Sequence, residues 1–110
     1  MRQGEIWFAD LEPTKGSEQS GRRPVVIISG NTLNETLPII IVVPLSSKIK
    51  EYPTCVRISP IRSSGLKKAS EAIPFQVRTV SKKRLTKRIG RVSSDELREI
   101  IKGLFVSITH

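Results

Sequence analysis

Short apolar segments separated by turn-forming residues make up most of the chain. Segments 24–29 (PVVIIS) and 39–45 (IIIVVPL) are rich in β-branched residues and almost continuously apolar, which is typical of strands buried on both faces. The predicted strands are 5–11, 24–29, 39–45, 54–59, 72–80 and 87–92. Short strands with turn signals between them predict a mainly β protein, built as a small barrel or sandwich.

The last part of the chain has a different period. Apolar residues recur there at spacings of three and four, which place them on one face of an α-helix: Leu97, Ile100, Ile101, Leu104, Phe105 and Ile108. Ser93 and Glu96 form the pattern of a capping box. We therefore predict a C-terminal helix that begins after Ser93 and packs this apolar face, Phe105 included, on the sheet.

Two polar connections are candidates for functional loops. The longer one, 12–23 (EPTKGSEQSGRR), is unusually long for a connection within so small a protein. The second follows the predicted strand 39–45 and runs from Ser46 to Pro53. A length of 110 residues is that of a single domain, which we place at 1–110.

The longest apolar stretch, 37–45, spans nine residues and contains Pro38 and Pro44. A membrane-spanning helix needs about 20 apolar residues. The N-terminal residues contain no apolar run of the signal-peptide kind. We therefore expect a cytoplasmic protein without a membrane partner.

The net charge of +9 is concentrated in one segment. Residues 62–91 contain ten basic residues and one acidic residue, Glu71, whereas residues 1–55 are balanced. A basic run is often only a solvated surface, but this concentration on an otherwise balanced chain favours a polyanionic partner. Tyr52 and Phe75 are the aromatic residues outside the predicted core that could stack on bases.

The inventory of reactive side chains is short. His110 is the only histidine and Cys55 the only cysteine. An internal histidine base, a His-rich metal site, a disulfide and a thiolate metal cluster are therefore all improbable. We expect neither a metal nor a cofactor.

Three stretches near the N-terminus together resemble one known family: 4–7 (GEIW), 10–19 (DLEPTKGSEQ) and 21–26 (GRRPVV). Two further matches follow in the same order: 42–47 (VVPLSS), and 76–80 (QVRTV) with 83–85 (KRL). With these motifs the chain resembles the RNA-cleaving toxins of the MazF/PemK type over essentially its whole length. The resemblance implies a small SH3-like β-barrel with a C-terminal helix, of the CcdB/PemK-like fold.

The resemblance also implies an activity and partners. Members of the family act as homodimers and as metal-independent, sequence-specific endoribonucleases on single-stranded RNA. A cognate acidic antitoxin silences them by covering the RNA groove. Cleavage uses the 2′-hydroxyl of the RNA and leaves a 2′,3′-cyclic phosphate and a 5′-hydroxyl.

Arg23 matches the family's catalytic arginine before proline, and its guanidinium can hold two phosphate oxygens. Ser46 matches the Thr or Ser that contacts the scissile phosphate; the alternative is that it caps a turn. Glu18 matches a glutamate that is important in some members. It can act as a base or pair with a nearby arginine, and both interpretations stay open.

The remaining candidates are residues that the resemblance places in contact with RNA: Gln19, Ser47, Ser70, Gln76 and Arg78. Two departures matter. Some PemK-like members have a histidine where this chain has Ser17, and an Arg-x-Asp unit where it has 73–75 (IPF). These departures argue against a His/Asp acid–base pair and leave the Arg23–Ser46 chemistry.

Two other functions compete with cleavage. One is a non-catalytic nucleic-acid-binding module that uses only the basic segment. The other is inhibition of a protein target such as gyrase, as in the related CcdB fold. The long match across 13–24 and the presence of both Arg23 and Ser46 favour the endoribonuclease.

Overall fold

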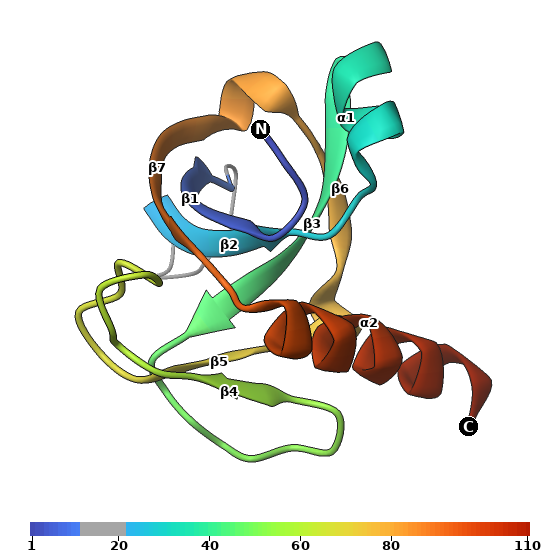
Figure 1. Cartoon of the computed structure of the whole chain (residues 1–110). Helices are drawn as coiled ribbons and strands as arrows, with labels where there is room; N and C mark the ends of the chain where they lie inside the picture. Colours follow the sequence, from blue (N-terminus) through green and yellow to red (C-terminus); the bar gives the residue numbers. More distant parts are fainter. Residues whose placement is uncertain (12–21) are drawn as a thin grey trace.

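The computed structural model describes residues 1–11 and 22–110 (Figure 1). Its strands are β1 (Glu5–Asp10), β2 (Arg22–Ile27), β3 (Ile39–Ser46), β4 (Val56–Ile58), β5 (Ser70–Ala72), β6 (Arg78–Ser81) and β7 (Leu85–Arg91). Its helices are α1 (Asn31–Thr36) and α2 (Ser94–Thr109), with single 3₁₀ turns at η1 (Pro74–Gln76) and η2 (Lys82–Arg84). The prediction of a mainly β protein with a C-terminal helix is confirmed.

The strands form one antiparallel sheet that curls into a half-barrel (Figure 1). Its order is β4-β5-β3-β2-β1-β7, and β6 pairs with the first half of β3. The pairing of β1 with β7 shifts register between Ile6 and Trp7 and again between Phe8 and Ala9. Such irregularities increase local twist and bend the strand, which helps the sheet to curl.

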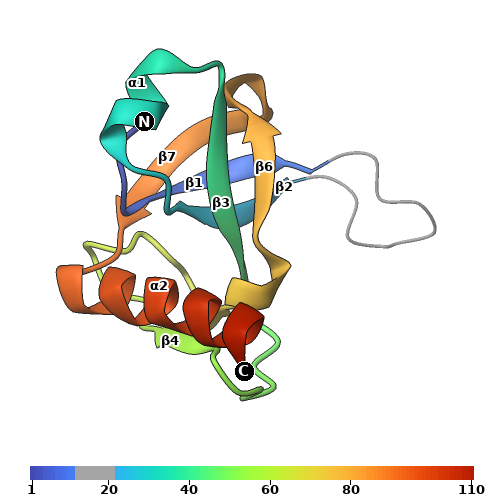
Figure 2. The ribbon, with the colours of Figure 1, turned by 90° about the vertical axis from the view of Figure 1, so that its right-hand side faces the viewer.

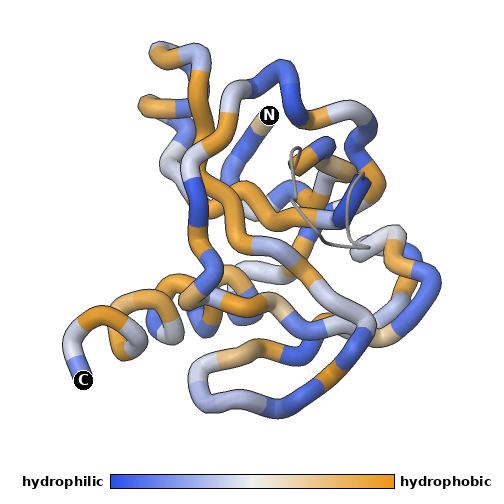
Figure 3. Tube along the Cα trace, turned by 180° about the vertical axis from the view of Figure 1, so that it is seen from behind, coloured by the Kyte–Doolittle hydropathy of each residue, from blue (hydrophilic) through white to orange (hydrophobic). Residues whose placement is uncertain are grey.

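The continuous apolar character of β2 has a direct structural explanation. Val25 and Ile27 point into a cluster on one face of the sheet, whereas Val26 points into a second cluster on the other face, where Ile28 also packs. The first cluster is enclosed by the curled sheet, and the second is covered by α2 through Ile100. In Figure 3 the central strands are mostly apolar and the connections around them mostly hydrophilic.

The prediction of one continuous strand at 72–80 is wrong. The strand is interrupted after β5 by η1 and resumes as β6 along the same neighbour, β3. Pro74 explains the interruption, because proline has no N–H for the ladder and suits the first position of a helical turn.

The short helix α1 had no signal in the hydrophobic pattern. Its buried Asn34 forms hydrogen bonds with the carbonyl and the hydroxyl of Ser29.

Helix α2 has the predicted capping box, in which Ser93 and Glu96 bond to each other's backbone N–H. It lies across one end of the sheet, opposite the end that carries α1 (Figure 2). Its packing differs from the prediction, however. Ile100 and Gly103 are buried, but Phe105 is 62% exposed, as are other members of the predicted face, Ile101 (41%) and Ile108 (72%).

The close approach at Gly103 explains this difference. A Cβ atom at Gly103 would lie 2.6 Å from the backbone oxygen of Thr54, so the helix axis comes very near the connection before β4. Contact is therefore made along a narrow line that includes Ile100 and Gly103, and the rest of the apolar face stays uncovered. Among the described residues, no helix is long and apolar enough to cross a membrane.

Candidate RNA-binding groove

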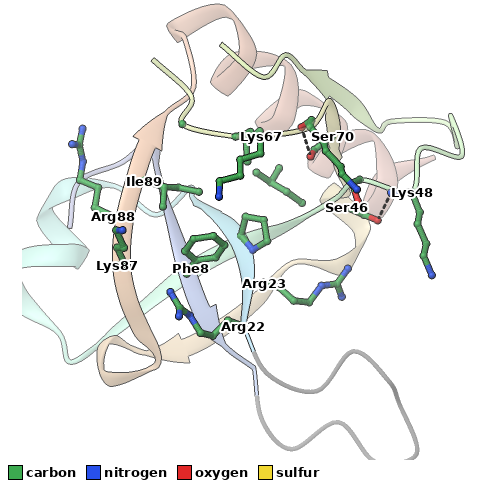
Figure 4. A pocket seen from close by; sticks show the side chains of 16 residues that line it. Phe8, Arg22, Arg23, Ser46, Lys48, Lys67, Ser70, Lys87, Arg88 and Ile89 are labelled. Atoms are coloured by element: carbon green, nitrogen blue, oxygen red, sulfur yellow. Dashed lines mark hydrogen bonds between the residues drawn. The ribbon is translucent and has the colours of Figure 1, made fainter. Parts of the chain in front are cut away.

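A groove of about 650 Å³ opens between the curled sheet and the connection from β4 to β5 (Figure 4). Strands β1, β2, β3, β5 and β7 all contribute to its lining, together with residues 47–48 and 65–68. Within the described residues, seven lining side chains are basic and none is acidic: Arg22, Arg23, Lys48, Lys67, Lys68, Lys87 and Arg88. Such a groove concentrates positive potential and attracts a polyanion.

Arg23 and Ser46 come together through the pairing of β2 with β3. The recorded register places Val25 opposite Pro44. Continued by two residues, it places Arg23 opposite Ser46, on the same face of the sheet. Both residues are half-buried and both line the groove (Figure 4).

The Ser46 hydroxyl has a defined orientation. Its Oγ accepts the backbone N–H of Lys48 at 3.1 Å, a bond that caps the turn after β3. Within the described part of the chain no hydrogen bond uses the hydroxyl proton, so it can be donated into the groove. Capping and phosphate contact, the two alternatives for Ser46, are thus compatible.

Arg22 and Phe8 form a further part of the lining. The guanidinium carbon of Arg22 lies 4.8 Å from the centroid of the Phe8 ring, which is cation–π geometry. Arg22 is exposed and Phe8 half-buried. The sequence did not predict this contact, because only the pairing of β1 with β2 brings the two residues together.

Lys67 and Lys68 are held over the groove by a tight backbone contact. A Cβ at Gly65, whose φ is +71°, would lie 1.8 Å from the carbonyl oxygen of Ile89 on β7. A Cβ at Gly90 would lie 2.2 Å from the carbonyl oxygen of Ser64. Only glycine at both positions lets the two segments approach this closely.

Arg88 is restrained by Glu5, which lies just outside the groove. The Nε of Arg88 is 3.1 Å from Oε2 of Glu5, and Oε1 accepts the Nε1–H of Trp7 at 2.9 Å. Partial burial raises the pKa of Glu5, but the hydrogen bonds from Trp7 and the backbone of Arg2, with the charges of the N-terminus and Arg88, bring its net pKa below 4.5.

The candidates taken from the sequence divide into three groups. Arg23, Ser46, Ser47 and Ser70 line the groove, although Ser70 is only 4% exposed and its Oγ donates to the carbonyl of Lys68. Gln76 in η1 and Arg78 in β6 are exposed but do not line it. Glu18 and Gln19 lie outside the described residues.

Tyr52 and Phe75 are both exposed, as expected, and their ring centroids lie 6.3 Å apart. Neither ring lines the groove. In the described residues, no three His, Cys, Asp or Glu side chains gather as a set of metal ligands.

Comparison with known proteins identifies the family. A family model described as PemK-like, MazF-like toxin of type II toxin–antitoxin systems matches residues 2–108. The chain is 40% identical to Endoribonuclease MazF9 of Mycobacterium tuberculosis, over 94% of this chain and 92% of that protein.

Solved structures confirm the fold. The crystal structure of MazF from Deinococcus radiodurans superposes with a TM-score of 0.83 at 22% identity, covering 100% of this chain and 97% of that one. A mycobacterial endoribonuclease in complex with its cognate antitoxin superposes with a TM-score of 0.81 at 20% identity, covering 98% and 94%. The chain therefore belongs to the PemK-like, MazF-like toxins of type II toxin–antitoxin systems.

Proposed function

We propose that the protein is an endoribonuclease that cuts single-stranded RNA in this groove. One observation carries the proposal: Arg23 and Ser46, the two residues that the family motif marks as catalytic, line a single groove whose described charges are all positive. The 40% identity to an endoribonuclease supports it.

The proposed chemistry is transesterification within the RNA. The 2′-hydroxyl gives its proton to a base, for which Glu18 is the candidate, and attacks the adjacent phosphorus. The bond to the 5′-oxygen breaks, and that oxygen takes a proton from solvent water. A 2′,3′-cyclic phosphate and a 5′-hydroxyl result. Arg23 would hold two phosphate oxygens and neutralise the charge that develops on them, and Ser46 would donate a hydrogen bond to an oxygen of the same phosphate. Glu18 remains a candidate base.

We assign binding to the other groove residues. Lysines such as Lys67 and Lys87 would contact phosphates, which brings affinity without sequence choice. Ser47 and Ser70 line the groove and would position the strand. Contacts from Gln76 and Arg78 would require the RNA to extend beyond the groove, and Gln19 remains a proposed base contact. This arrangement needs no metal, because Arg23 supplies the positive charge.

We further propose that an acidic cognate antitoxin competes with RNA for this groove, because both ligands are anionic. A related endoribonuclease has been solved with its cognate antitoxin. The protein would act in the cytoplasm, where cutting RNA stops translation and growth.

We propose that the toxin is a homodimer. Ile101, Phe105 and Ile108 form an exposed apolar stripe on α2, and such stripes are rarely left in contact with water. A second copy of the chain would cover it.

The decisive experiment incubates the purified protein with a long unstructured RNA in excess EDTA and maps the ends of the products. We expect discrete cuts that end in cyclic phosphates. Arg23→Ala should abolish them, whereas the matched control Arg62→Ala, exposed and outside the groove, should not. A 2′-deoxynucleotide at the cut site should also prevent cleavage.

Three results would overturn the proposal. Binding of RNA without cleavage would indicate a non-catalytic module. Growth arrest with intact RNA would indicate a protein target such as gyrase. Cleavage that survives Arg23→Ala or the 2′-deoxy substitution would show that the mechanism is wrong.

A further inference from the structure

The connection that follows Ser46 has little regular structure, yet it supplies Ser47 and Lys48 to the rim of the groove. Its backbone is strained, because Glu51 has φ of 56° and Thr54 has φ of 74°. Residues other than glycine adopt this left-handed region only where the surroundings hold them there.

The side chain that holds the connection is Glu71. Its Oε1 accepts the backbone N–H of Lys50 at 3.0 Å, and its Oε2 accepts the backbone N–H of Glu51 at 3.2 Å. Glu71 lies in the middle of β5, directly opposite Ser46 in the pairing with β3. Its neighbour Ser70 lines the groove, whereas Glu71 does not.

A carboxylate is a costly choice at this position. Glu71 is only 3% exposed, and within the described residues it makes no ion pair. Burying a charge without an ionic partner is unfavourable, and an apolar side chain would fill the space at lower cost. What the carboxylate offers is two acceptor oxygens for two adjacent N–H groups. A glutamine, with one acceptor and one donor, cannot provide both.

The two hydrogen bonds to Glu71 belong to a series of hydrogen bonds that leads to Ser46 in the groove. Lys48 donates its N–H to Ser46 Oγ, and two residues later Lys50 donates to Glu71. Fixing the backbone at Lys50 and Glu51 limits where the N–H of Lys48 can lie. The position of that N–H in turn determines the direction in which the Ser46 hydroxyl can donate.

We propose that Glu71 is a positioning residue for RNA cleavage: its buried carboxylate holds residues 48–51 so that the Ser46 hydroxyl points at the scissile phosphate. This inference rests on the proposed catalytic role of Ser46. Glu71 itself does not contact RNA, and it makes the one acidic residue of the basic segment part of the catalytic apparatus.

The first test compares Glu71→Gln with Glu99→Gln. Both remove one carboxylate, but the Glu99 side chain is exposed on α2, outside both the groove and the connection that Glu71 holds. We expect Glu71→Gln to lower kcat about tenfold or more, because small errors in orientation are costly in catalysis. RNA affinity, measured with a 2′-deoxy-substituted strand, should change less than about threefold because the basic residues are untouched. Glu99→Gln should leave both unchanged.

The second test asks whether Glu71 acts through Ser46. In a Ser46→Ala background, Glu71→Gln should lower kcat less than about twofold, because the hydroxyl that it orients is absent. A loss as large as in the wild type would mean that Glu71 acts independently of Ser46, and would overturn the inference. A loss confined to RNA affinity would overturn it equally.

The third test needs neither a variant nor cleavage. Hydrogen exchange on the wild-type protein should show slow exchange for the amides of Lys50 and Glu51, in a connection that has no ladder to protect them. Rapid exchange would overturn the inference even if every kinetic result were as expected.

The failure of the proposed function can be told apart from the failure of this inference. If the protein does not cleave RNA at all, the proposed function is wrong, and slow exchange still shows that Glu71 holds the connection. If Glu71→Gln does not fold, Glu71→Asp replaces it in the kinetic tests.

Discussion

Arg88 on β7 and Glu5 on β1 form an ion pair at the edge of the groove, with Nε and Oε2 3.1 Å apart. The same carboxylate also accepts hydrogen bonds from Trp7 and from the backbone of Arg2. Glu5 therefore links the first and last strands of the half-barrel and holds a groove arginine in place. Its pKa is lower than in the unfolded chain, so its contribution to stability depends on pH.

Replacing Glu5 by glutamine should lower the free energy of unfolding by about 1–2 kcal/mol at pH 7. Because the folded-state pKa lies below the ordinary 4.5, the stabilisation is fully present above that pH and is lost as pH falls through the folded-state value. Urea unfolding should therefore show a difference between wild type and Glu5→Gln that shrinks from pH 7 to pH 3. A difference that stays constant would contradict this. Glu99→Gln, an exposed carboxylate on α2, is the control.

Neutralising groove lysines should weaken RNA binding in a salt-dependent way. Lys67→Gln and Lys87→Gln should each reduce the slope of log K against log salt by about 0.7, the value for one phosphate contact on a single strand. Fluorescence anisotropy with an uncleavable RNA measures this. Lys102→Gln, on the exposed side of α2, should leave the slope unchanged; an equal effect there would indicate general attraction rather than a defined groove.

Gly90→Ala should destabilise the protein by about 3 kcal/mol, because the new Cβ meets the backbone oxygen of Ser64 at 2.2 Å and the backbone must move. The matched control is Gly30→Ala. Gly30 has φ of −67°, and nothing lies within 4 Å of its Cβ position, so its effect should stay below about 1 kcal/mol. Chemical denaturation of the two variants measures these effects. Equal midpoints would show that the close approach of Gly90 to Ser64 contributes little to stability.

Cys55 should react slowly with iodoacetamide. Burial raises the pKa of its thiol above the ordinary 9.0, and the nearby carboxylate of Glu71 raises it further. The alkylation rate should therefore rise with pH through a midpoint above 9.0, and Glu71→Gln should move that midpoint downward. A midpoint that does not move would place the Glu71 charge too far from the thiol to matter. The alkylation rate of Cys55 in the denatured protein is the reference for both the rate and its midpoint.

Phe105→Ser combined with Ile108→Ser should convert the proposed dimer into a monomer, because it removes two of the most exposed apolar side chains of α2. Sedimentation equilibrium measures the change. The N-terminal half of α2 keeps its capping box and Ile100, so the helix should remain folded in the variant. A wild-type protein that sediments as a monomer would refute the dimer directly.

Much of the fold follows from local patterns. The strong β-branched character of 24–29 and 39–45 placed β2 and β3, and the capping box with its three-and-four spacing placed α2. The error at 72–80 has a local cause, because Pro74 interrupts the strand. The error in how α2 packs occurred where a long-range contact overrides the pattern. Phe105 fits the helix stripe but is exposed, because Gly103 determines how the helix sits on the sheet.

The candidate site, like the fold, was predictable where residue motifs identify it and not where it depends on tertiary contacts. Sequence motifs singled out Arg23, Ser46, Ser47 and Ser70 without any knowledge of their separation, and all four line one groove. They could not single out Phe8 as a partner of Arg22, because that contact depends on the register between two strands.

The sequence by itself determined the class of the protein. It also indicated the negative charge expected of a partner and a candidate catalytic pair, because these depend on residue types and short spacings. Only the tertiary structure decided how the charge is arranged. Glu71 is a single acidic residue in a basic segment when read along the chain. In the folded protein Glu71 lies opposite Ser46 in the strand pairing. Its buried carboxylate accepts the backbone N–H groups of Lys50 and Glu51 beneath the connection that follows Ser46, and it does not line the groove. These hydrogen bonds join segments about twenty residues apart in the chain, so only the tertiary structure could form them. They satisfy the buried carboxylate and use it to hold the groove's rim.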